Sequence, residues 1–273
     1  MTSKTTTHPF EKAIRLDAIG DDLRRGRTRP EWTGMVGPFG GITAAVLLRA
    51  IETHPDRIGD PVAMTVNFAA PIVDGDFDVS LRAARTNRTN QHWTLELSQD
   101  GDVKTTATAL FGIRRDTWSD TEADPPSAPP PERVASSSGP GDFVGWGRLY
   151  DMRFFEGDFP GADAEPSPNA MSTMWMRDVA RRPVDYPALA ALCDIFFPRA
   201  FLRHGGFTPA GTISATIYFH ADQKELEAIG GDFVLGTASA NRFSRGYFDQ
   251  STQLWSRDGV LLATSHQIVY FKG

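Results

Sequence analysis

The chain has little of what several common functional classes need. It contains a single cysteine, Cys193, among 273 residues, which excludes an internal disulfide and a metal site built from several thiolates. No apolar run approaches the roughly 20 residues needed to span a bilayer. Residues 1–12 are polar and rich in threonine, without the apolar core of a signal peptide. We therefore expect a soluble cytoplasmic protein.

Positive charge and familiar hydrolase motifs are also scarce. Lysine and arginine total 28 against 34 acidic residues, so the net charge is −6. A general nucleic-acid binder needs a basic surface, so this class of partner is excluded. The chain has no Gly-x-Ser-x-Gly elbow, which argues against an α/β-hydrolase triad. It has no His-Glu-x-x-His or other close ligand cluster, which argues against metal-assisted hydrolysis, so we expect neither a metal nor a cofactor.

The clearest positive signal is a layout that occurs twice. Residues 254–267 predict a strand, a tight Asp-Gly turn and a second strand. Residues 95–109 have the same layout around an earlier Asp-Gly pair. Eight residues after the turn glycine, the later copy has Gln267 and the earlier copy has Ala109. This difference suggests one working site and one structural copy.

Composition divides the chain into two similar parts. Residues 116–141 are rich in proline and serine and predict an extended, solvated linker between units 1–115 and 142–273. Each part predicts a helix followed by β-rich segments, over 40–53, 64–68 and 77–85 in the first part, and over 187–204, 215–219 and 233–240 in the second. The fold class is α+β: two tandem units, each with a helix wrapped by an antiparallel sheet, joined edge to edge with a cleft between them.

These features resemble the acyl-CoA thioesterase II type of double hotdog protein. The resemblance rests on Phe39-Gly40-Gly41 at the start of the first helix and on the tail segment LWSRDGVLLATSHQ. It implies a double hotdog fold and the hydrolysis of fatty acyl-CoA to a free acid and CoA, a reaction of lipid metabolism. It also implies a catalytic water held by three residues of the second unit, matched here by Asp194, Thr212 and Gln267.

The match departs from the family pattern at one place. After Thr212 and Ile213, the family has Asp-His-Ser, whereas this chain has Ser214-Ala215-Thr216. Ser214 and Thr216 are therefore alternatives to Thr212 as the hydroxyl that holds the water.

Asp194 has the local sequence of a general base. Its neighbours Cys193 and Ile195 are apolar, and burial raises the pKa of a carboxyl group. Pro198 lacks an N–H and leaves the carbonyl of Asp194 without its helical partner, so the helix should be kinked or interrupted here. The alternative is an Asp that caps backbone groups beside this irregularity.

Two further groups are candidates for substrate contacts. Gly40 and Gly41 would present backbone N–H groups and the positive helix end to a thioester oxyanion, although close helix packing also favours glycine. Arginines near strand ends could hold the CoA phosphates, without any one standing out: Arg82, Arg85, Arg88, Arg242 and Arg245.

Two other function classes remain open on the same fold. One is a non-catalytic acyl-CoA or acyl-carrier binding protein. The other is a hotdog hydratase or dehydratase, which would need a histidine beside the acid, whereas His220 is expected to be a strand residue. The sequence leaves the oligomeric state open, with a homo-oligomer among the alternatives.

Overall fold

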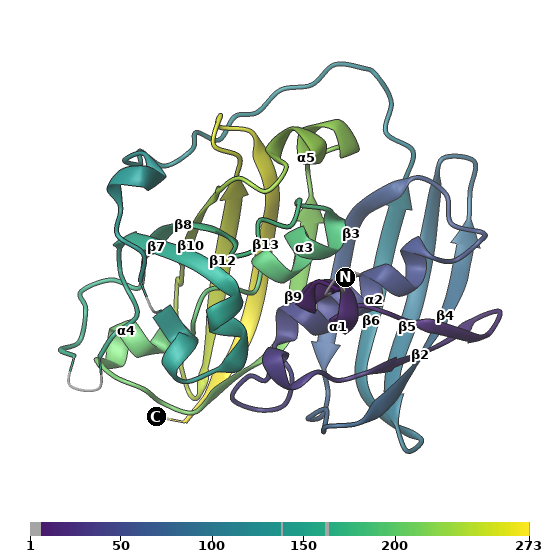
Figure 1. Ribbon diagram of the computed structural model, residues 1–273, viewed down its shortest axis with the longest axis horizontal. Helices are drawn as coiled ribbons and strands as arrows, with labels where there is room; N and C mark the ends of the chain where they lie inside the picture. The colour runs from purple at the N-terminus through teal and green to yellow at the C-terminus, as the bar shows by residue number, and fades with distance from the viewer. Residues whose placement is uncertain (1–6, 138, 162–163, 273) are drawn as a thin grey trace, which may run out of the picture.

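One large antiparallel sheet organises the molecule, and helices lie on one of its faces (Figure 1). The computed structural model describes residues 7–137, 139–161 and 164–272. The first part of the chain forms the strands β1 (Asp17–Gly20), β2 (Leu23–Arg27), β3 (Asp60–Phe68), β4 (Asp76–Thr86), β5 (Asn90–Gln99) and β6 (Asp102–Gly112). The second part forms β7 (Tyr150–Glu156), β8 (Ser172–Asp178), β9 (Ala210–Phe219), β10 (Val234–Ser239), β11 (Phe243–Ser244), β12 (Tyr247–Trp255) and β13 (Leu261–Phe271).

The helices are short apart from one. They are α1 (Pro9–Ala13), α2 (Gly40–Glu52), α3 (Tyr186–Leu192), α4 (Ala200–His204) and α5 (Gln223–Ile229), with 3₁₀ turns at Pro30–Trp32, Pro131–Arg133, Gly139–Asp142 and Gly145–Leu149. α2 is almost wholly buried, and its Leu47, Leu48 and Ile51 are fully enclosed. This burial stabilises a helix whose sequence is mostly small and apolar.

Counted outward from the middle of the sheet, the two sides have matching strand orders. The full order is β1-β2-β4-β5-β6-β3-β9-β13-β12-β10-β8-β7, with β11 paired to β12. From the seam between β3 and β9, the neighbours are β6, β5 and β4 on one side and β13, β12 and β10 on the other. At this seam the Thr65 and Thr216 hydroxyl oxygens lie 3.0 Å apart. The two parts therefore join edge to edge, as the sequence predicted.

The predicted helix over 187–204 is wrong as a continuous element. α3 ends at Leu192, and the chain runs irregularly until α4 begins at Ala200. Pro198 lies in this gap, and its missing N–H and bulky ring disfavour a continuous helix. The predicted interruption beside Asp194 is confirmed.

The prediction for the second Asp-Gly turn needs correction. The hairpin connection at Asp258-Gly259 is longer than a two-residue turn: Trp255 pairs with Leu261, and five residues lie between them. Within it, the Gly259 N–H donates to the Ser256 carbonyl and closes a β-turn. By contrast, Asp100-Gly101 forms a two-residue turn in which both residues have positive φ.

The linker is also less solvated than its composition predicts. It crosses over the sheet as a long trace at the top of Figure 1, and residues 113–130 are mostly exposed. Beyond them, Pro131 and Val134 are buried. Val134 packs in a cluster with Trp175 and Trp255, because these indoles would otherwise expose a large apolar surface.

Candidate active site

Asp194 lies at the junction of the two parts of the chain. It follows the end of α3, which packs against α2. The Asp185 side chain accepts a hydrogen bond from the backbone N–H of Ala188 and fixes the start of α3. At the other end, the Asp194 carboxylate faces the first turn of α2: a Cβ built on Gly40 would lie 2.6 Å from Asp194 Oδ2. Glycine is therefore required for this close approach.

A chain of hydrogen bonds links the three predicted water-holding residues. Gln267 Nε2 donates to Asp194 Oδ1 at 2.9 Å, and Thr212 Oγ1 donates to Gln267 Oε1 at 3.2 Å. Gln267 Nε2 also lies 3.4 Å from the carbonyl oxygen of Cys193. The structure thus brings together side chains from β9, β13 and the end of α3. Because both ends of the Gln267 amide are engaged, this residue orients its two neighbours.

A β-bulge brings Thr212 to this site. The pairing of β13 with β9 shifts between Ile268 and Val269, where Val269 lies opposite Thr212 and Ile268 opposite Ser214. Ile213 is the extra residue and is 43% exposed. Regular alternation from the buried Ala215 would have pointed Ile213 inward and Thr212 outward. The bulge reverses this order.

The two alternative hydroxyls lie elsewhere. Ser214 Oγ donates to Asn67 Oδ1 at 2.9 Å, and Thr216 is paired with Thr65 across the seam. Neither residue lines the cavity beside Asp194. The geometry therefore favours Thr212 over both alternatives.

The environment of Asp194 changes its acidity. Burial raises the pKa of this carboxyl group from 3.8 to about 7, although hydrogen bonds from Gln267 and from the Gly41 backbone N–H oppose the shift. Burial also raises the pKa of the adjacent Cys193 thiol, so this residue stays protonated near neutral pH. Asp194 is therefore the group beside this cavity that can exchange a proton near pH 7.

The same contacts separate the roles that were predicted for the two glycines. The N–H of Gly41 is engaged by the Asp194 carboxylate. Gly40 lines the cavity itself. Of the predicted oxyanion donors, Gly40 is thus the one that borders the space where a substrate could lie.

Asp194 and Thr212 open onto a cavity of about 560 Å³. Its walls come from both parts of the chain and are mainly aromatic and aliphatic: Phe39, Phe68, Trp146, Phe159, Phe196, Phe197, Phe201, Phe207, Ile213 and Val269. Among the residues that the structure describes, and aside from the aromatic rings, four polar side chains line the cavity: Asp194, Thr212, Gln250 and Lys272. A mostly apolar pocket with a few placed polar groups is typical of a ligand site.

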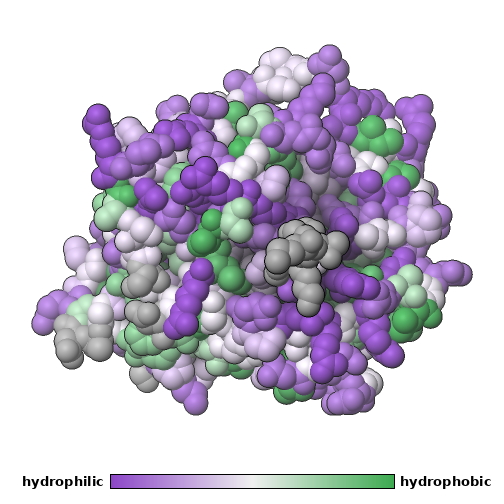
Figure 2. All heavy atoms as spheres, in the orientation of Figure 1, coloured by the Kyte–Doolittle hydropathy of each residue, from purple (hydrophilic) through white to green (hydrophobic). Residues whose placement is uncertain are grey.

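The mouth of the cavity is identified by exposed lining residues. Val36 is 63% exposed, Phe143 64% and Phe207 54%. The face shown in Figure 2 is mostly hydrophilic, with hydrophobic side chains in small separate groups. Exposed apolar side chains that line the same opening are typical of a binding site.

Sequence reasoning missed two of the polar lining residues. Gln250 is 1% exposed, and its only sequence signal is a glutamine at an inward position of a predicted strand. Lys272 follows the last strand. The five arginines proposed for CoA phosphates do not line the cavity, and neither does His220, whose Nε2 lies 3.0 Å from Thr264 Oγ1.

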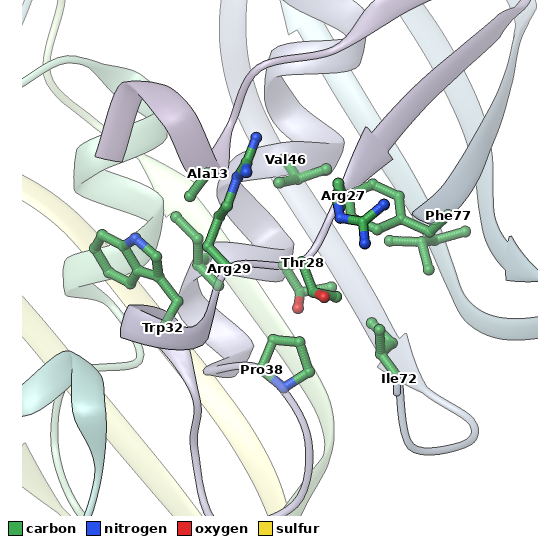
Figure 3. A pocket seen from close by; sticks show the side chains of 12 residues that line it. Ala13, Arg27, Thr28, Arg29, Trp32, Pro38, Val46, Ile72 and Phe77 are labelled. Atoms are coloured by element: carbon green, nitrogen blue, oxygen red, sulfur yellow. The ribbon is translucent and has the colours of Figure 1, made fainter. Parts of the chain in front are cut away.

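A second cavity lies within the first part of the chain. It measures about 20 Å³, which is room for a water molecule. Figure 3 shows it beneath α2, between side chains that include Arg29, Thr28 and Ile72. Across residues 7–137, 139–161 and 164–272, no three His, Cys, Asp or Glu side chains gather where they could hold a metal. In the same residues, no helix has the length and apolar character needed to cross a membrane.

Two family models match most of the chain. The acyl-CoA thioesterase N-terminal domain matches residues 28–112, and the acyl-CoA thioesterase C-terminal domain matches residues 121–271. No protein with a curated description matches the chain significantly.

Solved structures agree with these matches in fold. A conserved protein of unknown function with a hot dog fold from Alicyclobacillus acidocaldarius is 46% identical, with a TM-score of 0.92, and the match covers 98% of this chain and 99% of the other. A putative thioesterase II from Thermobifida fusca is 19% identical, with a TM-score of 0.82 and coverage of 97% and 98%. The tesB protein of Mycobacterium avium subs paratuberculosis is 20% identical, with a TM-score of 0.78 and the same coverage. The chain has the hotdog fold and belongs to the acyl-CoA thioesterase family.

Proposed function

We propose that this protein hydrolyses fatty acyl-CoA to a free acid and CoA, with Asp194 as the general base for a catalytic water. The observation that carries the proposal is the hydrogen-bonded chain Asp194–Gln267–Thr212 at the wall of an apolar cavity. The cavity can take an acyl chain, and the carboxyl group beside it has a pKa of about 7. A base with this pKa is about half ionised at neutral pH.

The reaction would take place in two steps. Asp194 accepts a proton from water as the water oxygen forms a bond to the thioester carbon. The carbonyl oxygen then carries the negative charge, which the backbone N–H of Gly40 and the positive end of α2 stabilise. The C–S bond breaks as this intermediate collapses, and the departing CoA thiolate takes the proton back from Asp194.

Thr212 and Gln267 would have different tasks. The Thr212 hydroxyl donates to Gln267 and keeps free lone pairs that can accept a hydrogen bond from the water. Gln267 does not line the cavity, so it would act by holding Asp194 and Thr212 in position. Gln267 binds Oδ1, and Oδ2 faces the first turn of α2, where Gly40 lines the cavity, so the water would meet the carboxylate on that side.

We also infer that the chain is a double hotdog protein. Its units would be residues 1–115 and 142–273, joined by residues 116–141, with the catalytic residues in the second unit. The matching strand orders on both sides of the seam and the two successive family domains support this division. Gly40 belongs to the first unit, so the site would need both.

Incubation of the purified chain with acyl-CoAs of several chain lengths tests the proposal, with release of free thiol as the readout. We expect turnover that is unchanged by EDTA, because the proposed chemistry uses a carboxylate and water. Loss of activity in EDTA with recovery on adding a divalent ion would contradict the mechanism. Tight binding without thiol release would instead identify an acyl-CoA binding protein.

A further inference from the structure

Gln250 is a buried polar residue that the proposed mechanism does not use. It lines the same cavity as Asp194 and is 1% exposed. Its Nε2 points to the carbonyl oxygen of Phe196 in a long contact of 3.5 Å, while its Oε1 has no hydrogen-bond partner. Reversing the amide would place two acceptors against each other, so the free atom is the acceptor. Leaving a buried acceptor without a partner destabilises the folded state.

The equivalent position in the first part of the chain shows that this polarity is not required by the fold. There, Trp93 pairs with Ala109, and Ala109 pairs with Met64. In the second part, Gln250 pairs with Gln267, which pairs with Ala215. All six side chains are buried, but the first row is apolar and the second has two amides.

The position of Gln250 limits what its free oxygen can contact. Gln250 and Gln267 are direct cross-strand neighbours, whose Cβ atoms lie about 4.5–5.5 Å apart, and Gln267 bonds Asp194. The free acceptor thus lies near the reacting carbon. The charged nucleotide end of CoA must leave through the exposed mouth, and Lys272 is an exposed residue of the same cavity wall. Gln250, buried beside Phe196, is left to face the acyl group.

We propose that Gln250 is a specificity-determining residue, whose Oε1 accepts a hydrogen bond from a hydroxyl on the acyl chain within a few bonds of the thioester. The substrate class is then a hydroxyacyl-CoA, and this inference rests on the proposed function. Because the acceptor is fixed on a strand, it should prefer one configuration of the hydroxyl-bearing carbon. A site that pairs a substrate donor discriminates more strongly than an apolar wall.

The test compares octanoyl-CoA with the two enantiomers of 3-hydroxyoctanoyl-CoA. The wild-type chain should give one enantiomer a higher kcat/KM than octanoyl-CoA. Gln250→Met keeps the length of the side chain and removes the acceptor, so it should lower this ratio about tenfold, the effect of one buried hydrogen bond. Octanoyl-CoA has no hydroxyl that could pair with Gln250, so its hydrolysis in each variant serves as the reference that removes any general effect of the substitution from the ratio.

Thr252→Val is the matched control. Thr252 lies two residues further along β12, is 2% exposed and has a hydroxyl without a partner, but it does not line the cavity. Its substitution should leave the ratio unchanged. An equal loss for both substrates in Gln250→Met, or a wild-type chain that does not distinguish them, would overturn the inference.

Binding of thioether analogues, which lack the scissile bond, separates this inference from the proposed function. Calorimetry should show that the hydroxylated analogue binds the wild-type chain more tightly than the plain one, with the difference lost in Gln250→Met. Selective binding without hydrolysis of the thioesters would refute the proposed function and support the role of Gln250. Hydrolysis of the thioesters with equal binding of the two analogues would support the proposed function and refute the role of Gln250.

Discussion

Two rows of side chains at equivalent places in the sheet have opposite character. The row in the first part of the chain is closed by Trp93, whose indole N–H donates to Gln91 Oε1. The Trp93 ring also packs edge-to-face against His54, with the ring centroids 4.9 Å apart. The row in the second part has Gln267 and Gln250 beside a cavity of about 560 Å³. The first row is thus closed by an indole, whereas the second has two amides beside an open cavity.

Under the proposed function, this difference lets one scaffold combine a stable core with a reactive site. Burial of large aromatic side chains contributes to the free energy of folding, whereas a buried carboxyl group and an unpaired amide oxygen reduce it. Catalytic sites often accept such a cost. The first part of the chain can compensate, because α2 and α3 pack together and the two parts share one continuous sheet.

The largest expected effect comes from removing the charge at the open site. Asp194→Asn should lower kcat for acyl-CoA hydrolysis about 10²–10⁴-fold, because the water loses its general base, while substrate binding changes much less. Steady-state kinetics with free thiol as the readout measure kcat and KM. Glu52→Gln is a suitable control, since burial also raises the pKa of Glu52 but this residue does not line the cavity. Near-normal turnover in Asp194→Asn would rule out the proposed base.

The second expected effect is on the row closed by Trp93. Trp93→Ala should lower the free energy of unfolding by about 3–5 kcal/mol, the usual loss for a fully buried large aromatic side chain. Urea denaturation measures it. Gln250→Ala should cost clearly less, because its side chain already borders a cavity and leaves an acceptor unpaired. Equal losses at the two positions would show that the rows do not differ as described.

The third effect concerns stability as a function of pH. The folded pKa of Asp194 is about 7 and its unfolded value is 3.8, so between these values the folded state retains a proton that the unfolded state has lost. Wild-type stability should therefore fall as pH rises through this window. At pH 8, Asp194→Asn should be more stable than the wild type by about 2 kcal/mol, because only the wild type carries a buried charge at this position. Denaturation curves at pH 4 and pH 8 should show the difference only at the higher pH.

The smallest effect separates two threonines of the same strand. Thr212→Val should slow hydrolysis about tenfold, because the water and Gln267 each lose one hydrogen bond. Thr216→Val should change turnover little, since Thr216 pairs with Thr65 across the seam. A larger loss at Thr216 would mean that the bulge does not bring the working hydroxyl to the site.

Much of this arrangement could be predicted from local patterns. The β-rich segments at 64–68 and 77–85, the helix over 40–53 and the Asp100-Gly101 turn were predicted, since they reflect short-range preferences of the backbone. The contrast between Ala109 and Gln267 pointed to unequal copies. The position of Pro198 predicted the break beside Asp194, because the loss of a backbone donor is a property of the residue itself.

Other features depend on contacts between distant segments. Gln250 could not be identified, because a glutamine in a strand is ordinary until the cavity beside it is known. The inward orientation of Thr212 depends on a bulge of one residue, which no local pattern in β9 predicts. The burial of the linker depends on Trp175 and Trp255, which lie far along the chain.

The sequence alone therefore determined most of the elements, the repeated layout and the residue types available for chemistry, because these follow from side-chain shape and periodicity. The tertiary structure decided which of these residues meet. Packing of α3 on α2 places Gly40 against Asp194, and pairing of β9 with β13 brings Thr212 to Gln267. The pKa of Asp194 belongs to the tertiary structure as well, since desolvation depends on how all the surrounding segments exclude water.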